Sequence, residues 1–155
     1  MIKAYRVDDR LIHGQVQTQW LAHYQANRVI IVDDQVIKDS IAMQILKLAK
    51  PAGVDLVICG TDRALGLFAK DEKQEKARTF VIFKTIKTAA ILVGQGLEIK
   101  SLIVGPSSSR PGSVQMAKNT YFGKEELEAL EALTDAGVET VFQLLPGEPR
   151  EVYRR

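Results

Sequence analysis

One short segment gathers side chains that are suited to phosphoryl chemistry. The sequence RVDDRLIHGQV, residues 6–16, combines a histidine with arginines and aspartates directly after a short apolar-alternating start. A neutral imidazole is a nucleophile, and the planar guanidinium of arginine can hold two phosphate oxygens. We therefore expect His13 to attack a phosphoryl group that Arg10 helps to hold, with Asp8 or Asp9 orienting an arginine.

The residues that follow His13 add a second feature. We expect the first strand to end near Val7 or Asp8 and a helix to begin near Gly14 or Gln15. The positive end of a helix dipole disfavours imidazolium, and the free amides of a first helical turn bind anions. The backbone amides of Gly14 and Gln15 are therefore candidate phosphate ligands.

Three further phosphate-binding candidates come from other segments. Arg6 precedes the aspartates, while Ser107 and Arg110 lie in the stretch GPSSSRPGSVQMAKNTYF, residues 105–122. This stretch predicts a loop of unusual length, and long loops in compact domains are often functional or mobile. Ligands of open α/β sheets bind where the carboxyl ends of parallel strands meet, so we expect these residues to face the same edge as His13.

Other chemically notable residues have simpler explanations. His23 falls in the middle of the predicted helix without a charged cluster, which indicates a surface or boundary residue. Asp33 and Asp34 are typical of a turn that ends a strand. Cys59 is the only cysteine, which excludes an internal disulfide and a cysteine metal cluster, and we expect it to be a small buried strand residue. We expect neither a metal nor a cofactor.

The elements that must position these residues follow from periodicity. Six β-rich stretches begin near Ile2, Arg28, Val54, Thr79, Ser101 and Val138. The first four starts lie about 25 residues apart, which leaves room for a helix in each gap. Apolar residues recur at helical spacing in three of the intervening segments: Val16, Trp20 and Tyr24; Ile37, Ile41, Ile45 and Leu48; and Leu127, Leu130 and Leu133. This pattern predicts an α/β fold, an open and mainly parallel β-sheet of about six or seven strands with helices on both faces.

Length and charge limit the remaining possibilities. A chain of 155 residues fits one domain over residues 1–155. Its net charge of +2 is too small to indicate nucleic acid or an anionic membrane surface as a partner. No apolar run is long enough to span a membrane, and the first ten residues lack a signal-peptide core, so we expect a cytoplasmic protein.

The motifs resemble a known family. RVDDRLIHGQVQTQWL is similar to the N-terminal signature of the mannose and sorbose family of IIB components in the bacterial sugar phosphotransferase system, and NRVIIVDD, AKPAGVDLVI and RPGSVQMAKNTYF extend the resemblance over nearly the whole chain. The resemblance implies that His13 takes a phosphoryl group from a IIA protein or domain and transfers it to a sugar during uptake through membrane IIC and IID components. It also implies a homodimer, associated with the inner face of the membrane through IIC and IID.

Two other function classes fit parts of the sequence. A receiver-like signalling domain would use paired aspartates after the first strand, but it needs an aspartate after the third strand and a lysine after the fifth, and VICGT and LIVGPS offer neither. A noncatalytic protein-binding domain would use Arg6 and Arg10 only to face an acidic partner. Lys84 and Thr85 stand where many members of the resembled family have Thr-Asn, and this departure leaves partner or substrate preference open. The sequence identifies neither the sugar nor the ring nitrogen that would carry phosphate.

Overall fold

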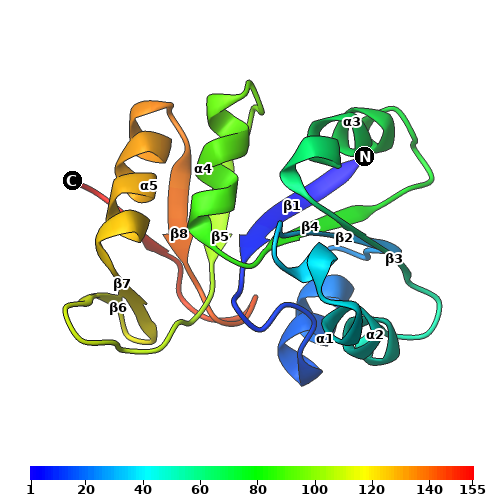
Figure 1. The fold of residues 1–155 in the computed structure, drawn as a ribbon, viewed down its shortest axis with the longest axis horizontal. Coiled ribbons are helices and arrows are strands. Elements are labelled where there is room, and N and C mark those ends of the chain that lie inside the picture. Colours follow the sequence, from blue (N-terminus) through cyan, green and yellow to red (C-terminus); the bar gives the residue numbers. More distant parts are fainter.

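The computed structural model describes residues 1–155, with the exception of the Gln15 side chain. Its main sheet has seven strands in the order β3-β2-β4-β1-β5-β8-β9 (Figure 1). Their bounds are β1 (Ile2–Val7), β2 (Arg28–Val32), β3 (Asp55–Cys59), β4 (Thr79–Phe83), β5 (Ser101–Val104), β8 (Glu139–Phe142) and β9 (Glu151–Val152). All neighbours run parallel except β9, which pairs antiparallel with β8. The predicted open, mainly parallel sheet is confirmed.

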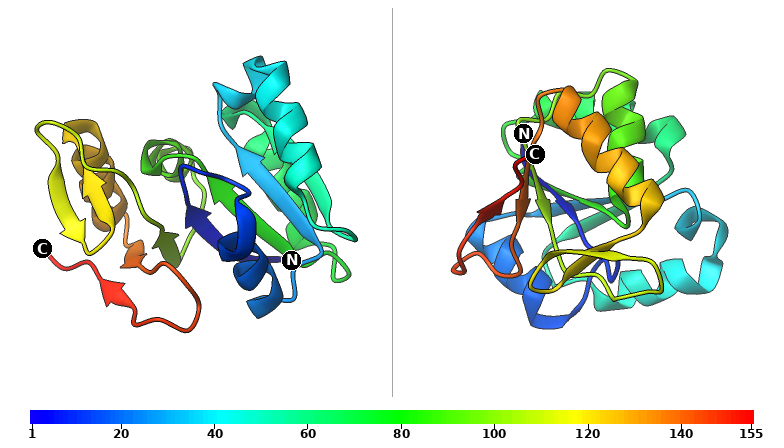
Figure 2. Two further views of the ribbon diagram at one scale, coloured as in Figure 1. Left: turned by 90° about the horizontal axis from the view of Figure 1, so that it is seen from below. Right: turned by 90° about the vertical axis from the view of Figure 1, so that its left-hand side faces the viewer.

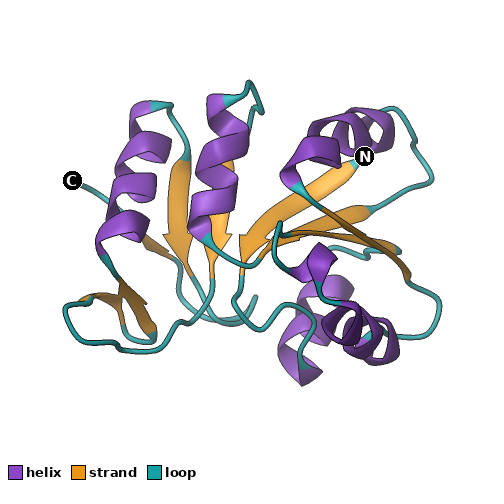
Figure 3. Cartoon of the chain, in the orientation of Figure 1, coloured by secondary structure: helices purple, strands orange, loops and turns teal.

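Helices cover both faces of this sheet, as predicted. They are α1 (Gly14–His23), α2 (Ser40–Ala49), α3 (Thr61–Glu72), α4 (Ile86–Gly94), α5 (Lys124–Asp135) and the short 3₁₀ helix η1 (Val36–Lys38). One core cluster packs under α3, α4 and α5, and a second lies under α1 and α2. The right-hand view of Figure 2 separates the two layers, and Figure 3 shows the same helices and strands by type.

The central strands are apolar on both faces because helices cover both. All five residues of β4 are buried. Val81 and Phe83 belong to the core under α3 to α5, while Phe80 and Ile82 alternate with them into the core under α1 and α2. This explains why the sequence shows short continuous apolar runs here rather than an apolar-polar alternation.

Helix α2 forms where its periodicity predicts, but its regular apolar stripe faces solvent. Ile41, Ile45 and Leu48 are 70%, 60% and 87% exposed, whereas Leu46 is buried. Ala42 packs beside Leu46 against the second core. The helix carries apolar residues on more than one side, so the spacing of the larger side chains did not identify the side that packs on the sheet.

The expected long loop contains a β-hairpin, so that prediction was wrong in part. Strands β6 (Val114–Ala117) and β7 (Thr120–Phe122) pair antiparallel. They are only three or four residues long, and the exposed side chains of Val114 and Gln115 weaken their apolar pattern. The buried side chains of Thr120 and Phe122 attach the hairpin to the rest of the fold.

No helix in the described structure is both long enough and apolar enough to cross a membrane.

Candidate functional site

The carboxyl end of β1 lies where the chain connections diverge. β1 pairs with β4 on one side and with β5 on the other. The chain leaves β1 into α1 on one face of the sheet, whereas it leaves β4 into α4 on the opposite face. In open α/β sheets, ligands bind in the crevice that such divergent connections leave. The loop of residues 8–13 occupies this position.

Apolar anchors shape that loop. Leu11 and Ile12 are buried in the core beneath α1 and α2, while Arg10 and His13 are exposed. The Leu11 N–H donates to the Asp8 carbonyl over 3.0 Å, and Leu11 has a left-handed φ of 57°. That conformation costs a non-glycine residue roughly 1–2 kcal/mol, which the burial of its side chain offsets. The loop thereby directs the side chains of Arg10 and His13 toward solvent.

Asp8 connects three elements around the loop. Its carboxylate is fully buried. Oδ1 accepts hydrogen bonds from the Arg10 backbone N–H at 3.0 Å and from Arg10 Nε at 3.5 Å. Oδ2 accepts from Gln17 Nε2 of α1 at 3.1 Å and from Arg6 Nη2 of β1 at 3.4 Å. Of the two candidate aspartates, Asp8 is the one that accepts hydrogen bonds from arginine side chains.

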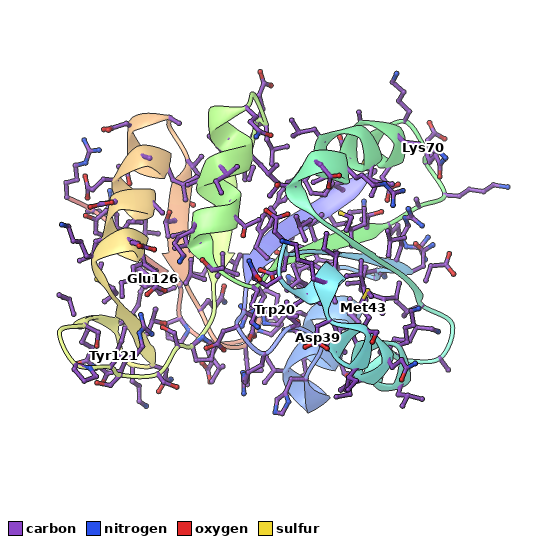
Figure 4. All side chains as sticks on the ribbon, in the orientation of Figure 1. Trp20, Asp39, Met43, Lys70, Tyr121 and Glu126 are labelled. Atoms are coloured by element: carbon purple, nitrogen blue, oxygen red, sulfur yellow. The ribbon has the colours of Figure 1, made fainter. Side chains whose placement is uncertain are left out.

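Arg6 lies beneath the loop, completely buried. Nη1 donates to the Gln143 carbonyl at 2.8 Å, Nη2 donates to the Leu144 carbonyl at 3.2 Å, and the guanidinium lies 4.8 Å from the centre of the Trp20 ring. Burial lowers the pKa of Arg6 to about 10, an effect that the charge of Asp8 opposes. Trp20, which Figure 4 labels near the centre of the molecule, also donates from Nε1 to the Leu144 carbonyl at 2.9 Å. Arg6 thus ties the segment after β8 to the candidate site.

Gly105 makes room for the Arg6 guanidinium. It follows β5, and its N–H donates to the Val7 carbonyl over 2.8 Å. A Cβ atom at Gly105 would lie 2.6 Å from Arg6 Nη2 and 3.1 Å from the Val7 carbonyl oxygen. A side chain therefore cannot enter this position without displacing the arginine.

His13 is the N-cap residue of α1. Its backbone is extended, with φ −146° and ψ 107°, and its own side chain makes no capping hydrogen bond. The first N–H groups of a helix lack partners within the helix, so the amides that begin at Gly14 can receive an anion beside the exposed imidazole. The structure thus places His13 and the predicted amide donors at one helix end.

His23 lies at the other end of the same helix. It is the last residue of α1 rather than a mid-helix residue, because the helix ends there. Its exposed ring packs edge-to-face against Tyr24 at 4.7 Å and Trp20 at 6.0 Å between centroids. The surface position is confirmed, and the negative end of the helix dipole gives an anion no attraction there.

Ser107 and Arg110 belong to the hairpin side of the edge. The Ser107 hydroxyl donates to the Tyr121 carbonyl at 2.7 Å and accepts from the Tyr121 N–H at 3.0 Å. Arg110 pairs with Glu126 in the first turn of α5 and donates to the Ser108 carbonyl at 3.1 Å. Within the described part of the chain, no hydrogen bond or ion pair joins either residue to the Asp8 network. Figure 4 shows Tyr121 and Glu126 on this side.

Electrostatic interactions extend from the His13 loop to the hairpin side of the sheet edge. Desolvation and then the charge of Asp8 raise the pKa of Asp9, whereas Arg10 and Lys84 act in the opposite direction. The charge of Glu126, the partner of Arg110, also raises the pKa of Asp9. The ion pair that holds Arg110 therefore lies within electrostatic range of the His13 loop.

The remaining polar residues at this edge have structural roles. Asp33 Oδ2 accepts from the backbone N–H groups of Gln35 at 3.1 Å and Val36 at 3.0 Å, and Asp34 Oδ1 accepts from the Thr61 N–H at 2.7 Å. The strand-ending turn that the sequence predicts is confirmed. Cys59 is buried as expected, and burial raises the pKa of its thiol to about 11.

Sequence reasoning missed three members of this site. Gln17 follows His13 by four residues and so lies on the same side of α1, a spacing that could have identified it. Trp20 was recognised only as a member of the apolar helix stripe. Gly105 was expected at this edge, but its role was not, because that role depends on the close approach of a side chain from another strand.

Known proteins resemble this chain in both sequence and fold. A family model of the PTS system sorbose subfamily IIB component matches residues 2–153. The sorbose-specific EIIB component of Klebsiella pneumoniae is 30% identical over 144 residues, which cover 93% of this chain and 87% of that protein. The crystal structure of the IIBSor domain from the same organism has a TM-score of 0.88 at 29% identity and covers 97% of this chain and 92% of its own.

Two further relatives carry other sugar names. The crystal structure of the N-acetylgalactosamine-specific IIB component 1 from Escherichia coli has a TM-score of 0.91 at 26% identity, covering 99% of this chain and 100% of its own. The mannose-specific EIIAB component of Escherichia coli K12 is 28% identical over 145 residues, and these cover 94% of this chain but 45% of that longer protein. The chain belongs to the sorbose subfamily of IIB components of the sugar phosphotransferase system.

Proposed function

We propose that this chain is a phosphocarrier that accepts a phosphoryl group from a IIA protein or domain on His13 and passes it to a sugar during uptake. The observation that carries the proposal is the position of His13. It is exposed, it caps the N-terminus of α1, and it lies at the topological switch point beside the buried Asp8 network.

The first transfer needs a ring nitrogen lone pair and little other chemistry. A nitrogen of His13 forms a bond to phosphorus while the bond between phosphorus and the donor atom of IIA breaks. In the second step a sugar hydroxyl oxygen attacks the phosphorus, the His13 bond to phosphorus breaks, and the released imidazole of His13 regains the proton that the hydroxyl loses. Catalysis of such steps rests on positioning and on charge stabilisation.

Arg10 and the first turn of α1 supply that stabilisation in our proposal. The side chain of Arg10 is 37% exposed, and Asp8 holds it through Nε, at the base of the guanidinium fork. This leaves the Nη groups available to hold two phosphate oxygens, while the backbone amides of Gly14 and Gln15 receive others. Asp8 acts by positioning, because its buried carboxylate cannot contact an exposed phosphoryl group.

The other predicted ligands have different parts in this proposal. Arg6 uses its Nη donors on Asp8 and on two backbone carbonyls, which makes it a positioning residue beneath the loop. The Ser107 hydroxyl stabilises the hairpin, and Arg110 contributes positive charge at the rim of the site. These two residues can meet the partner protein rather than the phosphoryl group held at α1.

The partners that we propose are IIA as donor and the membrane components IIC and IID at the transfer to sugar. The fused name of the mannose-specific EIIAB relative supports the pairing with IIA. In this proposal the chain is cytoplasmic and joins the inner face of the membrane through IIC and IID. The homodimer that the resemblance implies stays a prediction. Light scattering, which measures the mass of the particle in solution, would test it.

The two histidines of α1 provide a matched test. They lie about 15 Å apart at opposite ends of one helix, given a rise of about 1.5 Å per residue. We expect His13→Gln to fold normally and to take no acid-labile phosphate from a phosphorylated IIA donor, while His23→Gln takes one. Intact-protein mass spectrometry at alkaline pH measures the phosphate, and circular dichroism checks folding. A folded His13→Gln protein that gains an acid-labile phosphate would refute the assignment.

A further inference from the structure

Helix α2 presents an apolar stripe that no described residue covers. Ile41, Ile45 and Leu48 follow one another at spacings of four and three, so they lie along one side of the helix. All three are well exposed, and Leu48 is 87% exposed. Scattered exposed apolar side chains are ordinary, whereas three in a line on one short helix indicate an interaction surface.

Three lysines lie on the same segment as this stripe. Lys38 precedes the helix, Lys47 lies within it, and Lys50 is its C-cap residue; all three are exposed. None of them forms an ion pair with another described residue. The carboxylate on this segment is Asp39, which accepts from the Ala42 N–H at 3.0 Å as the N-cap. The stripe and its lysines therefore favour a partner that is both apolar and anionic.

A second copy of the chain fits this surface poorly. Two α2 helices packed antiparallel would bring Lys38 of one copy toward Lys47 and Lys50 of the other, which is repulsive. A stable interface also buries about 800 Å² on each partner. Three aliphatic side chains do not provide that area.

We infer that α2 is a docking helix for the surface of an anionic bilayer. Amphipathic helices with aliphatic residues on one side and lysines beside them lie in the membrane interface, where anionic headgroups attract the lysines. A small apolar patch is sufficient for binding there, because the free energy of inserting the aliphatic side chains adds to that of attracting the lysines to anionic headgroups. The overall charge of +2 gave no indication of such a surface, because acidic residues elsewhere balance the lysines of this segment.

Such docking would leave the candidate site accessible. Helix α2 packs on the same face of the sheet as α1, and Figure 4 labels its N-cap residue Asp39 and its residue Met43. Ile41, Ile45 and Leu48 lie outside the network of Asp8, Arg10 and Gln17. Bilayer binding would therefore raise the local concentration of the chain at the membrane without occupying His13.

The test is cosedimentation of the full chain with lipid vesicles. Vesicles with equal parts phosphatidylglycerol and phosphatidylcholine are compared with vesicles of phosphatidylcholine alone, at low and at high salt. The variant pairs Ile45→Glu with Leu48→Glu, and the matched control is Ile91→Glu, a 48% exposed residue of α4 on the opposite face. We expect the unmodified chain and the control to bind the anionic vesicles and to dissociate as salt rises. We expect the double variant to bind at least about tenfold more weakly, with unchanged circular dichroism, because both side chains are exposed.

Three results would overturn this inference. One is no binding of the unmodified chain to anionic vesicles at low salt, and another is equal binding by the double variant. The third is self-association in light scattering that the double variant abolishes, which would assign the stripe to a second copy of the chain. Phosphate transfer to His13 is measured without vesicles, so failure here does not affect the proposed phosphocarrier role.

Discussion

Replacement of Asp8 by asparagine removes the charge that holds the site network together. The change keeps the size of the side chain and one carbonyl oxygen. That oxygen can still accept a hydrogen bond from the Arg10 backbone N–H or from the side chain of Gln17. Arg6 loses its only charged partner within the described structure, and its buried guanidinium keeps two carbonyl acceptors. The effect of the substitution on unfolding free energy therefore depends on the cost of leaving the buried Arg6 cation unpaired.

The pKa of Arg6 gives the scale of that cost. Burial lowers it from 12.5 to about 10, which corresponds to roughly 3 kcal/mol for keeping the folded guanidinium charged. Because the folded pKa of this cation lies below its unfolded value, the cost is present at neutral pH and falls only as pH rises through the range from about 10 to 12.5. Loss of Asp8 removes the interaction that opposes this lowering.

We expect Asp8→Asn to lower the free energy of unfolding by about 3 kcal/mol. Breaking a buried pair costs about 3–5 kcal/mol, and the 3.4 Å separation of Arg6 Nη2 and Asp8 Oδ2 places this pair at the lower end. The corresponding fall in Tm is about 6–12 °C for a chain of this size. In an Arg6→Met background, where no cation is left unpaired, the same substitution should cost only about 1 kcal/mol.

Urea unfolding of the four proteins in this double-mutant cycle, followed by circular dichroism at neutral pH, measures the coupling. The values above predict a coupling of about 2 kcal/mol. Additive effects, with a coupling below about 0.5 kcal/mol, would show that Asp8 does not stabilise the buried charge of Arg6.

Three further predictions follow from single contacts. Gly105→Ala should lower unfolding stability by about 2 kcal/mol, because its Cβ would lie 2.6 Å from Arg6 Nη2, whereas Gly147→Ala, with nothing within 4 Å, should be neutral in the same urea assay. Arg10→Lys should slow phosphate transfer from IIA about tenfold or more with intact folding, since lysine lacks the planar fork; an unchanged rate in rapid-quench kinetics would exclude Arg10 from the site. Cys59 should resist iodoacetamide in the folded protein at pH 8, because burial raises its pKa to about 11; rapid alkylation detected by mass spectrometry would contradict the burial.

The sheet was predictable because its signals are local. Buried parallel strands are short continuous apolar runs, and the spacing between them leaves room for helices. The missed strands are those whose residues do not bury a regular face, such as β6 with exposed Val114 and the two-residue β9. The exposed stripe of α2 was beyond prediction for a related reason: periodicity locates an apolar face without saying what covers it.

The candidate site was predictable only where its residues are neighbours in sequence. Asp8, Arg10 and His13 lie in one loop, and their types alone indicate phosphate chemistry. The burial of Arg6 depends on backbone carbonyls of Gln143 and Leu144, which no side-chain pattern encodes. These carbonyl groups lie more than a hundred residues from Arg6 in the sequence. They can be identified as its partners only when the strand order of the sheet is known.

The most direct test of the central claim is to locate the phosphate on the chain. Trypsin cleaves after Arg10 and Arg28, so one peptide, LIHGQVQTQWLAHYQANR, carries both histidines. The chain is phosphorylated by a phosphorylated IIA donor and digested at alkaline pH, and fragment ions that break the peptide between Gly14 and Ala22 separate the two positions. We predict one phosphoryl group on His13 and none on His23. Phosphate on His23, or on any residue outside this peptide, would contradict it.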